Sequence, residues 1–281
     1  FIDTFETLRA HRERLGLKGK IVNIGSINFN YTGADLQEKI RNFIKDAYLN
    51  WDTEYVLLAA DDGEIPHRGL YADAGGGYDD DDIASDLYYA ALDGNWNTDS
   101  DAYWGEPEEA DLIPEVSVGR ASISTADEAA NYVNKILKYE TAPVTSQIKV
   151  GQMLGELLWS DPTWAGDYKD EIKNGASTHG YTTVGFPPSF TVHTLYDRDL
   201  DPYSWDKEDV IPLMNGGRHL INHLGHSDVT YGVRMYNSDV ETRFTNDGVS
   251  NSYFILYTQG CYSGSFDNRT ASGSYIDDCL G

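Results

Sequence analysis

The sequence is poor in cysteine and has no long apolar run. It holds two cysteines in 281 residues, Cys261 and Cys279, which excludes a small scaffold held together by several disulfides. One bridge between these two residues is compatible with the sequence, and it would consume the Cys261 thiol. No apolar run reaches the roughly 18 residues of a membrane span. The chain begins at Phe1 without a signal-like segment, and we expect that a leader has been removed.

Basic residues are scarce as well. Lys and Arg number 21 against 46 Asp and Glu, a formal net charge of −25. A surface of this sign repels phosphate backbones and anionic lipid faces, so we expect no nucleic-acid partner and no anionic membrane partner. The same surface favours divalent cations. Few cysteines, many aromatic residues and strong acidity are typical of an exported or cell-surface protein, and we expect secretion.

What the sequence does contain is a regular alternation of helical and extended patterns. The strand-like segments are 19–27, 54–62, 115–120, 148–154, 190–196, 218–226 and 253–261. The segments with helical spacing are 3–16, 33–51, 125–140, 167–178 and 204–217. Such alternation predicts an α/β fold with mainly parallel sheets flanked by helices. A polar, Pro-containing link at 141–147 divides it into two subdomains, 1–142 and 143–281.

One acidic region, 78–112, interrupts this alternation and has too few apolar residues for an element of its own. Oxygen-bearing side chains alternate along its middle, at Asp93, Asn95, Asn97, Asp99 and Asp101. Such a loop suits a hard cation that needs six to eight oxygen ligands, so we expect a structural calcium ion. The spacing is not that of an EF-hand, and a solvated acidic loop is the alternative.

Three of the seven histidines lie within eight positions, at His219, His223 and His226. On a helix they would share a face and could bind zinc. The segment is rich in Ile and Leu, however, and Gly225 interrupts it, which favours a strand. No Glu follows His219, as the H-E-x-x-H motif requires. We therefore interpret His219 and His223 as hydrogen-bonded strand histidines, with His226 beyond the strand end.

A second strand pattern, 253–261, ends in Cys261. Both Cys261 and His226 directly follow a glycine, which allows the backbone to turn sharply out of a strand. In an open parallel sheet, ligands bind beyond the carboxyl ends of the strands. An imidazole beside a thiol raises its thiolate fraction or takes its proton during attack. The pattern therefore favours a Cys–His dyad over a buried structural cysteine.

At these residues the chain resembles the gingipain-type cysteine peptidases, which are related more distantly to caspases and legumains. "GHS" at 225–227 resembles the Gly-His-Gly of the family, and "QGCYSGSFD" at 259–267 resembles its cysteine motif. The two residues are 261 − 226 = 35 positions apart, close to the family spacing. Segments 55–68, 85–106 and 116–129 also resemble family segments. The resemblance implies a caspase-like three-layer sandwich whose catalytic subdomain is 143–281.

The resemblance also implies the roles of the site residues. Cys261 would be the nucleophile that forms a thioacyl intermediate, and His226 the general acid and base. The backbone N–H groups of Ser227 and Cys261 would form the oxyanion hole, although Ser227 replaces the usual Gly of the family.

A third, acidic residue often orients the histidine in this family. Spacing points to Asp167, and Asp170 and Glu156 are its rivals. Asp167 also begins a predicted helix, where Asp is common as a plain cap or dipole partner.

The implied activity is that of a cysteine endopeptidase that acts on proteins and peptides, with a preference for a basic P1 residue. The resemblance supports the calcium expectation and implies a zymogen. The catalytic subdomain lacks an expected helix and strand at its C-terminal end, so we expect missing segments, such as a second chain produced by processing. Two alternatives remain: a catalytically inactive calcium-binding surface module on the same fold, and a zinc hydrolase built on the histidine cluster.

Overall fold

The computed structural model describes residues 1–276 and 278–280. The chain forms two compact units. Unit 1 comprises Phe1–Val133 and Ser265–Asp267, and unit 2 comprises Asn134–Gly264 and Asn268–Gly281. The division falls inside helix α5 (Ala126–Thr141), whereas the sequence pattern put it between 142 and 143.

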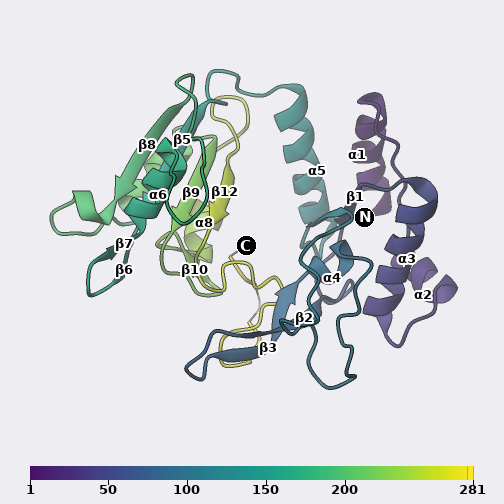
Figure 1. The fold of residues 1–281 in the computed structure, drawn as a ribbon. Coiled ribbons are helices and arrows are strands. Elements are labelled where there is room, and N and C mark those ends of the chain that lie inside the picture. The colour runs from purple at the N-terminus through teal and green to yellow at the C-terminus, as the bar shows by residue number, and fades with distance from the viewer. Residues whose placement is uncertain (277, 281) are drawn as a thin grey trace. The chain divides into compact units, whose positions relative to one another are not determined.

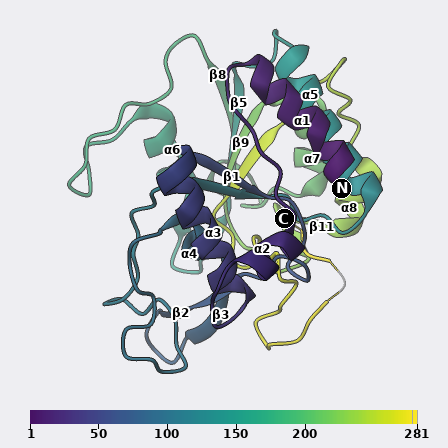
Figure 2. The ribbon, with the colours of Figure 1, turned by 90° about the vertical axis from the view of Figure 1, so that its right-hand side faces the viewer.

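Unit 1 combines helices with a parallel pair of strands (Figure 1). Its elements are α1 (Ile2–Arg14), α2 (Ile24–Asn30), α3 (Leu36–Trp51), β1 (Tyr55–Leu58), β2 (Arg68–Asp73), β3 (Asp79–Ser85), α4 (Leu87–Ala90) and β4 (Ser117–Arg120). Helix α3 is amphipathic and buries Ile40 and Ile44, which join a core that includes Tyr88, Tyr89 and Trp96. Helices α2 and α3 lie side by side (Figure 2).

The strand predicted over 19–27 is wrong, because helix α2 begins inside that range. The side chain of Asn23 accepts a hydrogen bond from the Gly25 N–H and caps the first turn, which favours a helix at this point. Ile24 and Ile27 are three positions apart and both pack on the core of unit 1. Two apolar residues three positions apart occur both on one face of a helix and in a short apolar strand, so the pattern alone did not distinguish the two.

The expectation that 78–112 forms no element of its own is also wrong. Strand β3 lies in this segment and pairs antiparallel with β2, and α4 follows it. Backbone pairing with β2 holds the acidic strand, and its Asp79 and Asp81 side chains are exposed. Apolar residues are few here but concentrated, and Tyr88, Tyr89 and Trp96 are almost fully buried.

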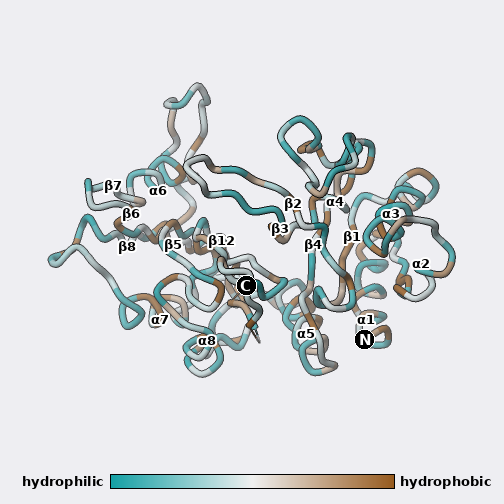
Figure 3. Tube along the Cα trace, turned by 90° about the horizontal axis from the view of Figure 1, so that it is seen from below, coloured by the Kyte–Doolittle hydropathy of each residue, from teal (hydrophilic) through white to brown (hydrophobic). Residues whose placement is uncertain are grey.

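Unit 2 is built on a four-stranded parallel sheet in the order β12-β9-β5-β8. Its strands are β5 (Val150–Gly155), β8 (Thr191–Tyr196), β9 (Leu220–Leu224) and β12 (Ile255–Thr258). Helix α6 (Ala165–Asn174) covers one face, and α7 (Lys207–Asn215) and α8 (Asn237–Arg243) cover the other (Figure 3). The remaining elements are short: β6 (Leu157–Trp159), β7 (Thr163–Trp164), η1 (Asp197–Asp199), β10 (Tyr231–Gly232) and β11 (Met235–Tyr236).

The core of unit 2 lies between the sheet and α7. It is formed by buried residues of the strands, of α7 and of the flanking loops: Leu154, Trp205, Val210, Ile211, Met214, Ile221, Val233 and Met235. Burying each of these side chains contributes roughly 1.5–3 kcal/mol before the entropy cost. The prediction of an α/β fold with a mainly parallel sheet flanked by helices is confirmed. Among the helices of the described residues, none is both long and apolar enough to cross a membrane.

Candidate active site

His226 and Cys261 occupy equivalent places beyond two adjacent strands. Strands β9 and β12 are parallel neighbours, and His223 is the register partner of Thr258. His226 lies 226 − 223 = 3 residues beyond this pair on one strand, and Cys261 lies 261 − 258 = 3 residues beyond it on the other. Both residues are exposed. The carboxyl edge of the sheet therefore presents an imidazole and a thiol from neighbouring loops.

These two loops touch at Gly260 and Ser227, the residues adjoining Cys261 and His226. A Cβ atom at position 260 would lie 1.8 Å from the Ser227 Oγ. No side chain fits in that space, so glycine is required by a close approach of the two loops. The contact fixes the separation of the backbones that carry the thiol and the imidazole.

The His226 ring is oriented by a backbone carbonyl. Its Nε2 lies 3.0 Å from the Leu157 carbonyl oxygen, and because a carbonyl only accepts, Nε2 carries the hydrogen. The Nδ1 atom of the neutral ring then keeps its lone pair and can accept a proton. The Leu157 peptide is held in turn, since its N–H donates to Asp197 Oδ2 at 2.7 Å and Asp197 is buried.

A buried carboxylate, Glu156, lies beside His226. Its Oε1 is 2.9 Å from His223 Nε2, its Oε2 is 3.4 Å from Arg234 Nε, and the backbone N–H of His226 lies close enough to favour its charged form. Burial raises the pKa of Glu156, but the His223 hydrogen bond, the charges of His223 and Arg234 and the His226 amide outweigh it, so the net pKa lies below the usual range. A Cβ at Gly225 would lie 2.4 Å from the Glu156 carboxyl carbon, which explains the glycine before His226.

The other two acidic candidates contact a different partner. Asp167 lies in the first turn of α6, its side chain is 63% exposed, and its carboxylate pairs with Arg198. Asp170 pairs with the same guanidinium. The structure thus places Glu156 against the His226 backbone and places Asp167 and Asp170 at Arg198.

The remaining histidines of the cluster are hydrogen-bonded within unit 2, as predicted. His219 Nε2 lies 2.5 Å from the Tyr139 hydroxyl, and the two rings stack. His223 is fully buried and bonds Thr258 through Nδ1 at 2.8 Å. Each has a role in the scaffold.

Sequence reasoning missed Lys169, which is fully buried in α6. Its Nζ donates to Asn222 Oδ1 at 2.7 Å and to Gln259 Oε1 at 2.6 Å. Burial lowers the pKa of Lys169 to about 8. The available signal was helical spacing, because Lys169 shares the buried face of α6 with Ala165 and Gly166.

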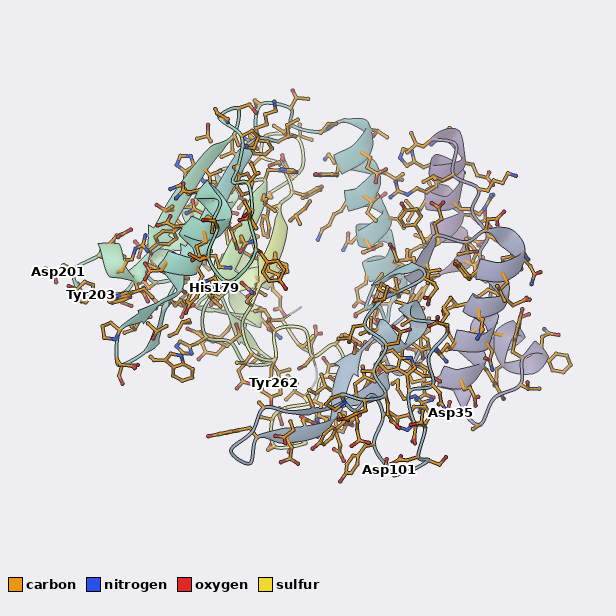
Figure 4. All side chains as sticks on the ribbon, in the orientation of Figure 1. Asp35, Asp101, His179, Asp201, Tyr203 and Tyr262 are labelled. Carbon is orange, nitrogen blue, oxygen red and sulfur yellow. The ribbon has the colours of Figure 1, made fainter. Side chains whose placement is uncertain are left out.

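Neither cysteine forms a disulfide, and Cys261 is exposed whereas Cys279 is buried. The bridge that the sequence allowed is therefore not formed, and the Cys261 thiol is available for chemistry. Figure 4 labels its neighbour Tyr262.

The side chains expected to bind calcium divide between two carboxylate clusters in unit 1. Asp99 and Asp101 join Glu106, with ligand atoms within 4.8 Å of one another. Figure 4 labels Asp101 on this acidic loop. Asp93 joins Asp111 and Glu115 within the same distance.

The two asparagines of the acidic loop behave differently from each other. Asn95 Oδ1 accepts the Asn97 N–H at 3.3 Å. Asn97 Oδ1 is buried and has no hydrogen-bond partner among the described residues. A set of carboxylate oxygens with one unsatisfied amide oxygen fits the ligand preference of Ca²⁺.

Comparison with known proteins identifies the family. A model of peptidase family C25 matches residues 1–280. The chain belongs to peptidase family C25.

Curated relatives in Porphyromonas gingivalis support this membership of family C25. Gingipain R2 is 25% identical over 236 residues, which is 81% of this chain and 26% of that protein. Lys-gingipain W83 is 24% identical over 204 residues, 70% of this chain and 9% of that protein. The chain thus spans about a quarter or less of the curated relatives it matches.

Solved structures similar to this C25 chain share its fold. The crystal structure of the Arg-specific cysteine proteinase gingipain R superposes with a TM-score of 0.59 at 21% identity, covering 86% of this chain and 47% of that one. A complex of its pro- and mature domains gives 0.62 at 22% identity, covering 94% and 52%. The protease of a third structure gives 0.66 at 18% identity, covering 99% and 52%. The caspase-like fold of the gingipains, expected from the sequence, is therefore confirmed.

Proposed function

We propose that this C25 member is a cysteine endopeptidase that uses Cys261 and His226 as a catalytic dyad. The observation that carries the proposal is their equivalent placement, three residues beyond a register pair of adjacent parallel strands. The close approach of Gly260 to Ser227 supports it by bringing the two loops together. The exposure of the free Cys261 thiol supports access of a peptide.

The chemistry follows from the orientation of the imidazole. The Nδ1 atom of His226 takes the thiol proton as the Cys261 sulfur attacks the peptide carbonyl carbon and forms a carbon–sulfur bond. Backbone N–H groups of Ser227 and Cys261 donate to the resulting oxyanion. The imidazolium returns its proton to the departing amine as the carbon–nitrogen bond breaks. Water then attacks the thioester, gives a proton to His226 and releases the acid, and the proton restores the thiol.

For the third residue of the site, we favour Glu156 over Asp167. Glu156 is buried, lies near the His226 backbone N–H and keeps a lowered pKa, so it stays anionic beside the loop that carries the imidazole. The Asp167 carboxylate is committed to Arg198 in a more exposed position. Glu156 acts as a positioning residue in this proposal.

A preference for a basic P1 residue is the proposed specificity. Two relatives support it by their descriptions, one as an Arg-specific cysteine proteinase and one as Lys-gingipain. The formal net charge of −25 favours the approach of a cationic substrate.

A structural Ca²⁺ ion in the acidic loop is part of the same proposal. The cluster of Asp99, Asp101 and Glu106 and the unsatisfied Asn97 Oδ1 would supply its oxygen ligands. The ion would hold the loop by compensating carboxylates that otherwise repel one another.

We also propose that the protein is exported or displayed at the cell surface, and that it matures from a zymogen by proteolytic processing that can leave a second chain. The solved complex of gingipain pro- and mature domains supports a processing step. The acidic, cysteine-poor composition supports export.

A cleavage profile on a denatured protein mixture tests the proposed activity. The wild-type protein should cleave after Arg or Lys. The Cys261→Ala variant should be inactive, and His226→Ala should lower kcat by about 10²–10⁴-fold, the usual contribution of general acid–base catalysis. Iodoacetamide should label Cys261 and abolish activity, whereas Cys279→Ala provides a matched control at the buried thiol.

The cleavage profile, combined with a calcium-binding measurement and a zinc-selective chelator, separates the alternatives. A flat cleavage profile with retained calcium binding would indicate an inactive calcium-binding surface module. Activity that resists iodoacetamide but is lost with a zinc-selective chelator would indicate a zinc hydrolase on the histidine cluster.

A further inference from the structure

A histidine and three carboxylates gather in unit 1, outside the residues of the proposed active site. His67 precedes β2, Asp82 lies in β3, Asp62 follows β1, and Asp267 belongs to the segment Ser265–Asp267 of the same unit. The ligand atoms of His67, Asp82 and Asp267 all lie within 4.8 Å of one another. Asp267 is 7% exposed, so this is not a solvated acidic surface.

The His67 ring is oriented by a carboxylate on its far side. Nδ1 lies 2.7 Å from Asp62 Oδ1, which also accepts the His67 backbone N–H at 2.7 Å. A carboxylate with this pair of contacts accepts, so Nδ1 carries the hydrogen. The Nε2 side of the ring faces Asp82 and Asp267. Once the ring gives up its Nε2 hydrogen, a histidine held by a carboxylate through its other nitrogen has the usual arrangement of metal-ligating histidines.

The spacing between His67 and Asp82 fits an ion between them. Nε2 and Asp82 Oδ1 are 3.3 Å apart, longer than the roughly 2.7–2.9 Å of a charge-assisted hydrogen bond. With zinc-like bonds of about 2.05 Å to nitrogen and about 2.1 Å to oxygen, that separation subtends an angle of about 105° at the metal. This angle is close to tetrahedral.

Two further contacts hold the ligands in place. Phe266 packs edge-on against the His67 ring, with ring centroids 5.9 Å apart, and this contact presents Asp267. Position 69 in β2 leaves room for Asp82, because a Cβ there would lie 2.2 Å from Asp82 Oδ1. The pairing of β2 with β3 therefore fixes the position of Asp82 in the cluster.

We propose that His67 Nε2, Asp82 and Asp267 bind a divalent transition-metal ion of the Zn²⁺ class, with Asp62 orienting the histidine. One imidazole nitrogen with two carboxylate oxygens suits Zn²⁺, Co²⁺ or Mn²⁺, whereas Ca²⁺ prefers oxygen ligands alone. Three protein ligands leave a position for water. The site is separate in residues and in ligand chemistry from the acidic loop.

Co²⁺ titration of the untagged protein tests the site, because tetrahedral Co²⁺ reports its geometry through visible absorption. The parent is Cys261→Ala, which removes the exposed thiol, and excess Ca²⁺ fills the oxygen-only clusters. We expect one equivalent of Co²⁺, displaced by Zn²⁺, and a rise in melting temperature with Zn²⁺. His67→Gln and Asp82→Asn in this parent should abolish both signals, and Asp62→Asn should weaken binding about 10–100-fold.

His179→Gln is the matched control, since His179 also lies near a carboxylate, 3.5 Å from Glu171, but is 68% exposed. It should leave binding unchanged. Melting in EDTA establishes that each variant is folded, and Asp82→Asn, at a side chain that is 41% exposed, keeps the test valid if His67→Gln does not fold. Unchanged Co²⁺ binding in the folded variants, or no binding by the parent, overturns the proposal; the second result leaves an imidazolium ion pair at this place.

Discussion

The Nε2 atom of His223 lies 2.9 Å from Oε1 of Glu156, and both side chains are buried, at 0% and 3% exposure. The other ring nitrogen of His223 bonds Thr258 Oγ1, which accepts the Gly260 N–H at 3.2 Å. A chain of hydrogen bonds therefore runs from the Glu156 carboxylate, through His223 and Thr258, to the backbone N–H of Gly260, the residue before Cys261. Side chains of β9 and β12 hold both loops of the proposed site.

Replacing His223 with Ala should destabilise the fold. The change leaves the buried Glu156 carboxylate without its ring partner, and breaking a buried pair in this way costs about 3–5 kcal/mol. Urea unfolding gives the free-energy change. His193→Ala, at an exposed position of β8, should stay within about 0.5 kcal/mol. Equal losses of stability in the two variants would contradict a stabilising role of the buried His223–Glu156 pair.

Glu156→Gln and Asp167→Asn should differ in their effect on catalysis. The first removes the buried charge near the His226 backbone, and displacement of the imidazole should lower kcat/KM by about 10²-fold. The second affects an ion pair at a mainly exposed carboxylate, worth about 0–1 kcal/mol, so kcat/KM should fall about fivefold at most. The pH dependence of kcat/KM should shift in the Glu156 variant alone. The reverse order would assign the orienting role to Asp167.

Stability should rise with pH in the alkaline range because of Lys169. Burial lowers its pKa from the usual 10.5 to about 8 in the folded state. Between these values the unfolded chain binds the extra proton, so the free energy of unfolding increases with pH. Below pH 8 both states are charged, and above 10.5 both are neutral.

The control for this effect is Lys169→Met, in which the rise between pH 8 and 10.5 should flatten. Lys173→Met, at the last turn of the same helix, should keep the wild-type profile. Denaturant unfolding at a series of pH values measures both. A wild-type profile that is flat over this window would refute the lowered pKa.

Calcium removal should lower the melting temperature. A ligand bound only to the folded state at 100 times its dissociation constant adds about 2.7 kcal/mol to stability. Asp101→Asn should weaken the response to added Ca²⁺, whereas Asp79→Asn, an exposed aspartate of β3, should not. Calorimetric scans with and without chelator make the comparison. Identical scans would exclude a structural calcium ion in this loop.

The placement of the candidate site residues beyond the strand ends could be predicted from the sequence, because it depends on local pattern. His226 and Cys261 each follow an apolar strand and a glycine, and the parallel sheet was expected from the helix–strand alternation. At the start of the helix predicted over 125–140, Thr125 and Glu128 exchange the two hydrogen bonds of a capping box, each accepting the backbone N–H of the other.

Partners that depend on strand order could not be predicted from the sequence with the same success. Glu156 follows β5, and it meets His223 because β5 and β9 are neighbours in the sheet, although 67 positions separate the two residues. Spacing alone favoured Asp167. Lysine is among the residue types least often buried, so the amino-acid type gave no reason to expect Lys169 in the core. Its burial depends on hydrogen bonds to Asn222 and Gln259, which are distant in sequence.

The contact between Gly260 and Ser227 makes these two positions interdependent. They share one volume, so a methyl group at 260 collides with the hydroxymethyl group at 227. Substitutions at the two sites should therefore show epistasis rather than additive effects. In evolution, a larger residue at position 260 therefore requires that a smaller residue first replaces Ser227.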